Sequence, residues 1–279
     1  MSAWAQSREL TRQSWAILKV NRGLTAYPLV GTICGVVPFI VLVPGVYFLA
    51  DNQNWIGWAL VAVGIYLATL VASLFQAGLV VSAAAVLDGK ETSFGHGMGA
   101  AFGRLGVLSR WALVSTLVTL LISALRGNNN AGLVEVIFRN VLAAAAGIMW
   151  QLITFFVMPA MMLDGLGMID AIKKSASTFK QRWGTQLSGG VRIGGMIGLL
   201  VMLPAILALV VGIVLTVIGA WPLGIPLAVL GFVALIIGSL VLGTMRGIFS
   251  VVLYRFATTG AVAPGFTEDQ LVHAIKVKA

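Results

Sequence analysis

The sequence predicts an all-α, polytopic membrane protein with six transmembrane helices in three hairpins and amphipathic helices on the cytoplasmic side. Hydrophobic residues make up 59% of the 279 residues and charged residues only 10%, whereas soluble domains carry about 25% charge. Six apolar segments are long enough to cross a hydrocarbon core about 30 Å thick as helices. Helices are expected because lipid cannot pair the backbone groups of an open sheet edge.

The predicted spans follow from the lengths of these apolar segments, which cover residues 28–50, 55–87, 105–125, 134–163, 191–220 and 223–257. Pro38, Pro44, Pro159 and Pro204 are expected to kink their spans. The chain is therefore read as one membrane domain, 1–279. Its parts are an N-terminal amphipathic segment (1–27), hairpins at 28–87, 105–163 and 191–257, a connector (88–104), an amphipathic helical region (164–190) and a cytoplasmic tail (258–279).

The distribution of basic residues predicts the orientation. The net charge of +9 would suit a nucleic-acid partner if the charges formed one soluble patch. Sorted by span, all but two of the 18 Lys and Arg residues fall on one side, and the other side holds only Arg126 and Arg139. Cytoplasmic loops collect positive charge. We therefore expect a multi-pass protein of the cell inner (plasma) membrane, with both termini cytoplasmic and no nucleic-acid partner.

The chain also predicts an internal repeat. "AVLDGKETSF" and "MMLDGLGMID" both carry Leu-Asp-Gly, at residues 87–89 and 163–165, and a degenerate counterpart with Thr259 and Gly260 follows the sixth span. The unit is a polar or amphipathic segment followed by a two-helix hairpin, used three times. Asp88 and Asp164 are expected either to cap the next helix or to form a turn with the following glycine.

The stretch "MIDAIKKSASTFKQRWG" predicts an amphipathic helix. Its apolar side chains share one stripe at helical spacing: Met168, Ile169, Ile172, Ala176, Phe179 and Trp183. This stripe can dip into the headgroup boundary or pack on the inner ends of the spans. The candidate membrane-surface contacts are the basic residues Lys173, Lys174, Lys180 and Arg182. The glycine-rich segment at residues 92–106 is expected to be a looser helix, a hinge or a mere connector.

Three polar residues are predicted to lie at one depth near the inner headgroup boundary. Gln76, Gln151 and Arg246 each precede the turn glycine of their repeat unit by about four helical turns. They could form a polar layer that grips a lipid phosphate, because polar groups facing a bundle interior often mark ligand paths. The alternative is that Arg246 snorkels and the glutamines bond between helices.

The sequence contains no constellation expected of an enzyme. Its 2 histidines and single cysteine, Cys34, have no spacing of a metal site, and no cofactor is expected. Glu135 and Arg139 have the spacing of a local ion pair on a helix. Gly31 with Gly35, Gly194 with Gly198, and Gly243 with Gly247 have the four-residue spacing that lets helix backbones approach each other.

"SWAILKVNRGLTAYPLV" followed by three hairpins resembles uncharacterised bacterial six-span integral membrane proteins, which are similar to the membrane domain attached to some glycerophosphodiester phosphodiesterases. The resemblance covers nearly the whole chain and includes no catalytic motif. It implies a membrane module without hydrolase activity of its own, and it assigns no functional residues.

Together these patterns predict a non-enzymatic membrane protein that handles or senses inner-leaflet lipid, or that supports assembly of a membrane complex. Its partners would be membrane lipid and, in the second case, another membrane protein or a second copy of itself. The competing class is a small-solute transporter or channel, for which broken helices and polar groups at the midplane are typical.

Overall fold

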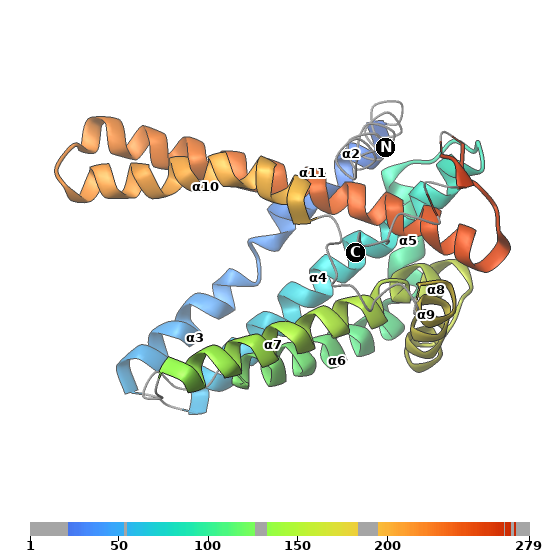
Figure 1. Ribbon diagram of the computed structural model, residues 1–279, viewed down its shortest axis with the longest axis horizontal. Helices are drawn as coiled ribbons and strands as arrows, with labels where there is room; N and C mark the ends of the chain where they lie inside the picture. The colour runs from blue at the N-terminus through green and yellow to red at the C-terminus, as the bar shows by residue number, and fades with distance from the viewer. Residues whose placement is uncertain are drawn as a thin grey trace. The chain divides into compact units, whose positions relative to one another are not determined.

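The computed structural model describes residues 22–52, 55–125, 133–183, 195–264, 266–268 and 271. Regular structure in these residues is α-helical (Figure 1), as the sequence predicts. The chain divides into two compact units. Unit 1 contains Met1–Pro28 and Trp183–Ala279, and unit 2 contains Leu29–Arg182.

Four helical segments are long and apolar enough to cross a membrane, namely Leu29–Leu49, Trp55–Leu87, Leu105–Ala124 and Val134–Leu163. They coincide with the first four predicted spans. Two shorter apolar stretches are Met202–Val217, inside the fifth predicted span, and Trp221–Leu235, which begins two residues before the sixth. The helical membrane class is thus supported, and the count of six spans stays a prediction.

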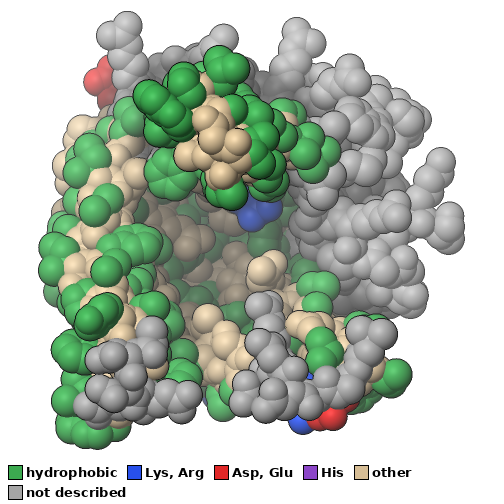
Figure 2. Space-filling view, turned by 90° about the vertical axis from the view of Figure 1, so that its left-hand side faces the viewer, with side chains coloured by type: hydrophobic (Ala, Val, Ile, Leu, Met, Phe, Trp, Pro, Cys, Tyr) green, Lys and Arg blue, Asp and Glu red, His purple; other side chains and the backbone are tan. Residues whose placement is uncertain are grey.

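Large hydrophobic side chains lie exposed along these helices. Ile40 is 72% exposed and Val134 is 82% exposed. On the face that Figure 2 shows, the side chains of the described residues are mostly hydrophobic, and few are charged. Exposed apolar surface on this scale marks an interaction surface, and on helices of this length the matching environment is lipid.

The first predicted span is broken at Pro38. α2 (Arg22–Gly35) and α3 (Phe39–Asn52) flank a tight turn at residues 36–38. In this turn the Val37 N–H donates to the Cys34 carbonyl at 3.2 Å. This bond spans three residues, whereas a bond in an α-helix spans four. Proline has no N–H to continue the helical ladder, so the predicted kink is confirmed here. α3 continues through Pro44.

Glycines bring the two helices of the first hairpin into backbone contact. α4 (Trp55–Leu87) packs on α3. A Cβ atom at Gly45 would lie 2.9 Å from the Val61 backbone nitrogen, and one at Gly57 would lie 2.9 Å from the Leu49 backbone nitrogen. At Gly64 the neighbour is the Leu42 side chain, at 2.5 Å. Only glycine therefore fits these three positions without a shift.

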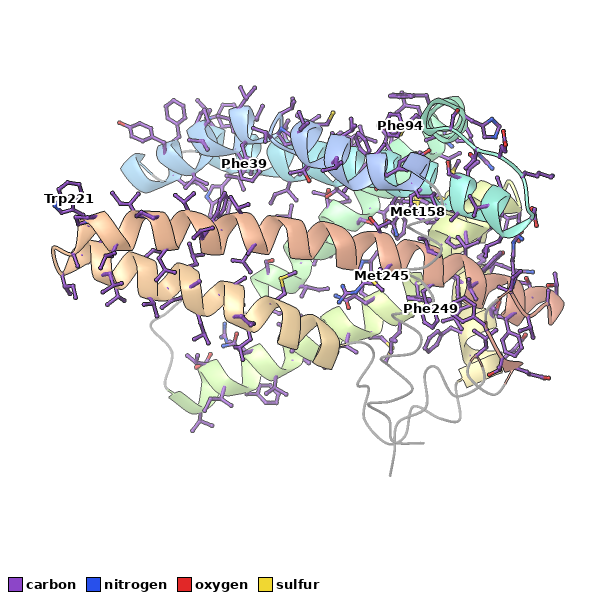
Figure 3. The ribbon with its side chains drawn as sticks, turned by 90° about the horizontal axis from the view of Figure 1, so that it is seen from above. Phe39, Phe94, Met158, Trp221, Met245 and Phe249 are labelled. Atoms are coloured by element: carbon purple, nitrogen blue, oxygen red, sulfur yellow. The ribbon has the colours of Figure 1, made fainter. Side chains whose placement is uncertain are left out.

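The third hairpin repeats this arrangement in unit 1. α10 (Gly195–Val217) and α11 (Trp221–Thr259) run side by side, as both Figure 1 and Figure 3 show. A Cβ atom built at Gly212, Gly224 or Gly231 would lie 2.3–2.5 Å from a backbone nitrogen of the opposite helix. The three positions are separated by twelve and then seven residues, the same intervals as in the first hairpin.

Of the residues in the four-residue glycine pairs, Gly31, Gly35 and Gly243 do not make such backbone contacts. A Cβ at Gly35 or at Gly243 would meet no atom within 4 Å, and one at Gly31 would meet only the Phe75 ring, at 3.2 Å. Gly194 lies outside the described residues. The expectation of close backbone approach at Gly35 and Gly243 is therefore wrong within their own hairpins.

The second hairpin is packed differently. α6 (Leu105–Ala124) and α7 (Leu133–Thr154) are joined by the stacked rings of Trp111 and Trp150, whose centroids lie 5.9 Å apart. Gly147 on α7 has no neighbouring atom within 4 Å of a built Cβ. Glu135 and Arg139 form the predicted ion pair on α7. Large side chains thus hold this hairpin, without a close glycine contact at Gly147.

Left-handed glycines end the long second helix of each hairpin. Gly89 follows α4 with a φ of 69°, Gly165 follows α8 (Val157–Leu163) with a φ of 68°, and Gly260 follows α11 with a φ of 74°. This conformation is typical of helix C-termini and favours glycine. The predicted turns at Asp88-Gly89 and Asp164-Gly165 are therefore confirmed.

The glycine-rich connector is helical. α5 (Phe94–Gly103) begins at Ser93, whose side chain accepts a hydrogen bond from the His96 N–H at 3.2 Å. Met98 and Ala101 form its buried side. α9 (Met168–Trp183) follows Gly165 as α5 follows Gly89. α5, α8 and α9 lie together at one end of unit 2 (Figure 1). We call it the basic end because α9 carries the exposed residues Lys173, Lys174 and Lys180.

Candidate functional site

The amphipathic helix α9 buries a face of small and hydroxylated residues. Ala171 and Ser175 are 0% exposed, and Thr178 and Phe179 are nearly as buried. Among the described side chains of the predicted apolar stripe, only Phe179 belongs to this face, because Met168, Ile172 and Ala176 are half-buried and Ile169 is 60% exposed. The side chain of Trp183 lies outside the described residues. The predicted stripe is therefore offset from the face that packs on the protein.

Ser175 is bonded to a break in the fourth predicted span. α7 ends at Thr154 and α8 begins at Val157. The Ser175 Oγ donates to the Ile153 carbonyl at 2.5 Å and accepts from the Phe156 N–H at 3.0 Å. One hydroxyl group thus bonds both a backbone donor and a backbone acceptor at the break, the kind of group that a helix terminus presents.

Pro159 explains why the helix breaks at this point. It lacks an N–H, and its ring clashes with the carbonyl four residues earlier, which belongs to Phe155. The Phe155 N–H bonds back to the Leu152 carbonyl at 3.4 Å, a turn of three residues. The kink predicted at Pro159 is confirmed, and it lies one turn before the proline.

Arg104 holds the other end of α8. It lies at the junction of α5 and α6. Its Nη1 donates to the Met161 carbonyl at 2.6 Å, and its Nη2 donates to the carbonyls of Gly165 at 2.8 Å and Leu166 at 3.1 Å. A cation that bonds the last carbonyls of a helix satisfies them and opposes the negative end of the helix dipole. The short helix α8 is therefore held by polar side chains at both of its ends.

The opposite side of α9 is basic and exposed. Lys173, Lys174 and Lys180 are all exposed, as are Ser177 and Gln181. At 100° per residue, Ile169 lies between the buried face and the side that carries Lys173 and Lys180. The side chain of Arg182, the fourth predicted contact, lies outside the described residues.

A second exposed hydrophobic side chain lies at the basic end. Phe102 on α5 is 57% exposed, and Leu105 one turn later is 41% exposed. α5 and α9 are linked through Arg104, whose guanidinium bonds residues just before α9. Exposed hydrophobic residues of α5 and α6 thus accompany α9, which itself combines an exposed hydrophobic residue with basic ones, as interfacial helices do.

The predicted polar layer is composed of exposed residues. Gln76 on α4, Gln151 on α7 and Arg246 on α11 are each exposed. At about 1.5 Å per residue, each lies roughly 27–38 Å from the first residue of its helix. This distance is about the thickness of the hydrocarbon core. The two glutamines belong to unit 2 and Arg246 to unit 1. The common layer stays a prediction.

Sequence reasoning missed a group of hydroxyls between α4 and α6. The Tyr66 hydroxyl and the Ser109 Oγ lie 2.7 Å apart, and the Thr116 Oγ1 donates to the Thr69 Oγ1 at 3.5 Å. Ser115 is 8% exposed, and its Oγ has no hydrogen-bond partner in the part of the chain that the structure describes. The sequence signal that could have found this group is that Tyr66 and Thr69 lie three residues apart, which places both on one face of a helix.

Within the described ranges, no group of three His, Cys, Asp or Glu side chains could hold a metal ion. What the basic end offers is a set of exposed ammonium groups beside exposed hydrophobic side chains. Such a surface can bind anionic headgroups by charge attraction while burying apolar atoms.

These are the features of a helical protein with, among its described residues, four helices long and apolar enough to cross a membrane, and with a basic helix bonded to a break in one of them. The chain belongs to a protein family of unknown function, DUF6159, whose model matches residues 56–265. No curated protein and no solved structure matches the chain.

Proposed function

We propose that this protein is a non-enzymatic integral protein of the bacterial inner membrane that binds anionic lipid of the inner leaflet through α9. The bound lipid is sensed or handled there, with both termini in the cytoplasm. In this proposal the basic end of unit 2 lies at the cytoplasmic boundary of the membrane. Gln76 and Gln151 of unit 2, and Arg246 of unit 1, are the further candidate contacts to headgroup phosphates in this proposal.

The observation that supports the proposal is the division of α9 into three sides. One side is buried through Ala171 and Ser175, one exposes Lys173 and Lys180, and Ile169 lies exposed between them. At a bilayer surface this arrangement places the isoleucine in the acyl boundary and the lysines among the phosphates.

Lipid retention tests the proposal. We expect purified protein to retain phosphatidylglycerol in native mass spectrometry. Each Lys near an anionic surface contributes about 1 kcal/mol, so changing Lys173, Lys174 and Lys180 together to Gln should weaken retention about a hundredfold. The matched control is Lys90→Gln, an exposed lysine outside α9. Equal retention by the triple variant and the wild type would contradict the proposal.

Labelling tests the orientation separately. In a Cys34→Ser background, single cysteines at Ser177 on α9 and Leu125 after α6 report the two ends of unit 2. An impermeant maleimide added to intact cells should label Leu125→Cys and spare Ser177→Cys. The reverse pattern would place α9 outside the cell and remove the inner leaflet from the proposal.

A solute transporter or channel is the second candidate, and one observation favours it. The hydroxyls of Tyr66, Thr69 and Thr116 lie between α4 and α6, well inside the apolar spans, and Ser115 on α6 is buried. Polar groups at this depth are expected along a solute path. Solute flux in proteoliposomes that is lost in Thr69→Val and Thr116→Val would establish this class instead.

A further inference from the structure

α9 is attached to the break in the fourth span by two contacts. The Ser175 hydroxyl bonds the Ile153 carbonyl and the Phe156 N–H. The rings of Phe156 and Phe179 pack with centroids 6.5 Å apart. Ser175 and Phe156 are both 0% exposed. A displacement of α9 therefore acts directly on the backbone at the break.

The far end of α8 is held in place by a different element. Arg104 bonds the carbonyls of Met161, Gly165 and Leu166 from the α5–α6 junction. All these bonds go to backbone atoms, so they fix the path of the chain. With its C-terminal end held, α8 can change its direction relative to α7 only at residues 155–156.

The same helix carries the basic side. Ser175 lies on the buried face of α9, while Lys173, Lys174 and Lys180 are exposed. α9 is a continuous helix of 16 residues, so a force on the lysines moves Ser175 with them. Proline-associated breaks are the places where a helix bends most easily.

We infer that α9 couples anionic lipid at its lysines to the angle between α7 and α8, with Ser175 as the positioning residue that transmits the movement. The inference rests on the proposed binding of lipid by α9. Contact with anionic headgroups draws α9 toward the membrane surface, and the Ser175 hydroxyl carries the Phe156 backbone along. The fourth span then has a different bend in anionic and in zwitterionic membranes.

A distance measured by pulsed electron paramagnetic resonance tests this coupling. Spin labels are placed at Ala145→Cys on α7 and Gln181→Cys on α9, both exposed, in a Cys34→Ser background. The protein is reconstituted in nanodiscs of phosphatidylcholine, with or without phosphatidylglycerol. Wild-type protein should show a shift of a few ångström in the mean distance when phosphatidylglycerol is present.

Two serines of α9 provide the comparison. Ser175→Ala removes the bonds at the break, so the distance should no longer respond to phosphatidylglycerol. Ser177→Ala is the control, because the Ser177 Oγ is exposed and donates only to the Lys174 carbonyl of its own helix, at 3.0 Å. It should respond as the wild type does. An unchanged response in Ser175→Ala would overturn the role of Ser175.

The wild-type measurement decides the inference even if Ser175→Ala does not fold. If wild-type protein retains phosphatidylglycerol through its lysines but the distance between residues 145 and 181 is equal in both nanodiscs, the coupling is refuted while lipid binding stands. If the three lysines make no difference to retention, the proposed function itself fails, and the coupling fails with it.

Discussion

The α10–α11 hairpin and the α6–α7–α8 segment show two ways of joining helices in one chain. In α10–α11, Gly212, Gly224 and Gly231 bring the backbones together, so the helices have no freedom to separate without losing the whole contact. In the second region, the helices are joined by a tryptophan stack and by polar side chains that bond a broken backbone. The first arrangement holds two helices in one fixed packing, and the second includes a break at which a helix can bend.

The largest effect is expected where a side chain would meet backbone. In Gly231→Ala the new Cβ would lie 2.4 Å from the Leu209 nitrogen, which cannot rotate away. Overpacking of this kind costs about 3 kcal/mol, and thermal unfolding in detergent should occur at a clearly lower temperature. Gly243→Ala on the same helix is the control. It meets no atom within 4 Å and should be neutral or slightly stabilising.

A smaller effect is expected from the polar clamp on α8. Arg104→Gln loses the charged hydrogen bonds to Met161, Gly165 and Leu166, which should lower stability by about 2 kcal/mol because the site is only partly buried. Arg110→Gln, an exposed arginine on α6, serves as the control. Equal melting temperatures for the two variants would show that the clamp contributes nothing.

The smallest effect is expected at Ser115, and its sign is the informative part. The buried Oγ has no partner among the described residues, so Ser115→Ala removes an unpaired polar atom and should leave stability unchanged or raise it by up to about 1 kcal/mol. A loss of more than that in thermal unfolding would mean that the hydroxyl binds water or a solute, which favours a transport path.

Much of the fold follows from local chemistry. The turns at Gly89, Gly165 and Gly260 are predictable because the left-handed conformation favours glycine. The breaks near Pro38 and Pro159 follow from the missing N–H of proline. The first and third hairpins share the same intervals between their close-contact glycines, and the repeat of the whole unit stays a prediction.

The contacts between distant residues could not be predicted in the same way. With 33 glycines in the chain, spacing alone could not show which ones meet a backbone, because that depends on the facing helix. Ser175 reads as one more polar residue of α9, and its partner Ile153 lies 22 residues earlier. Arg104 counted as a loop charge until the structure placed α8 against it.

The central claim is that α9 lies at a lipid surface. Its most direct test is the accessibility of two residues on α9 to a lipid-soluble and to an aqueous relaxer. Spin labels at Ile169→Cys and Ser177→Cys are compared in nanodiscs containing phosphatidylglycerol, using oxygen as the lipid-soluble relaxer and a nickel chelate as the aqueous one. The label at residue 169 should collide mainly with oxygen, and the label at residue 177 mainly with the chelate. Equal, chelate-dominated collision at both positions would show that α9 stands in water, and the account of lipid binding would be wrong.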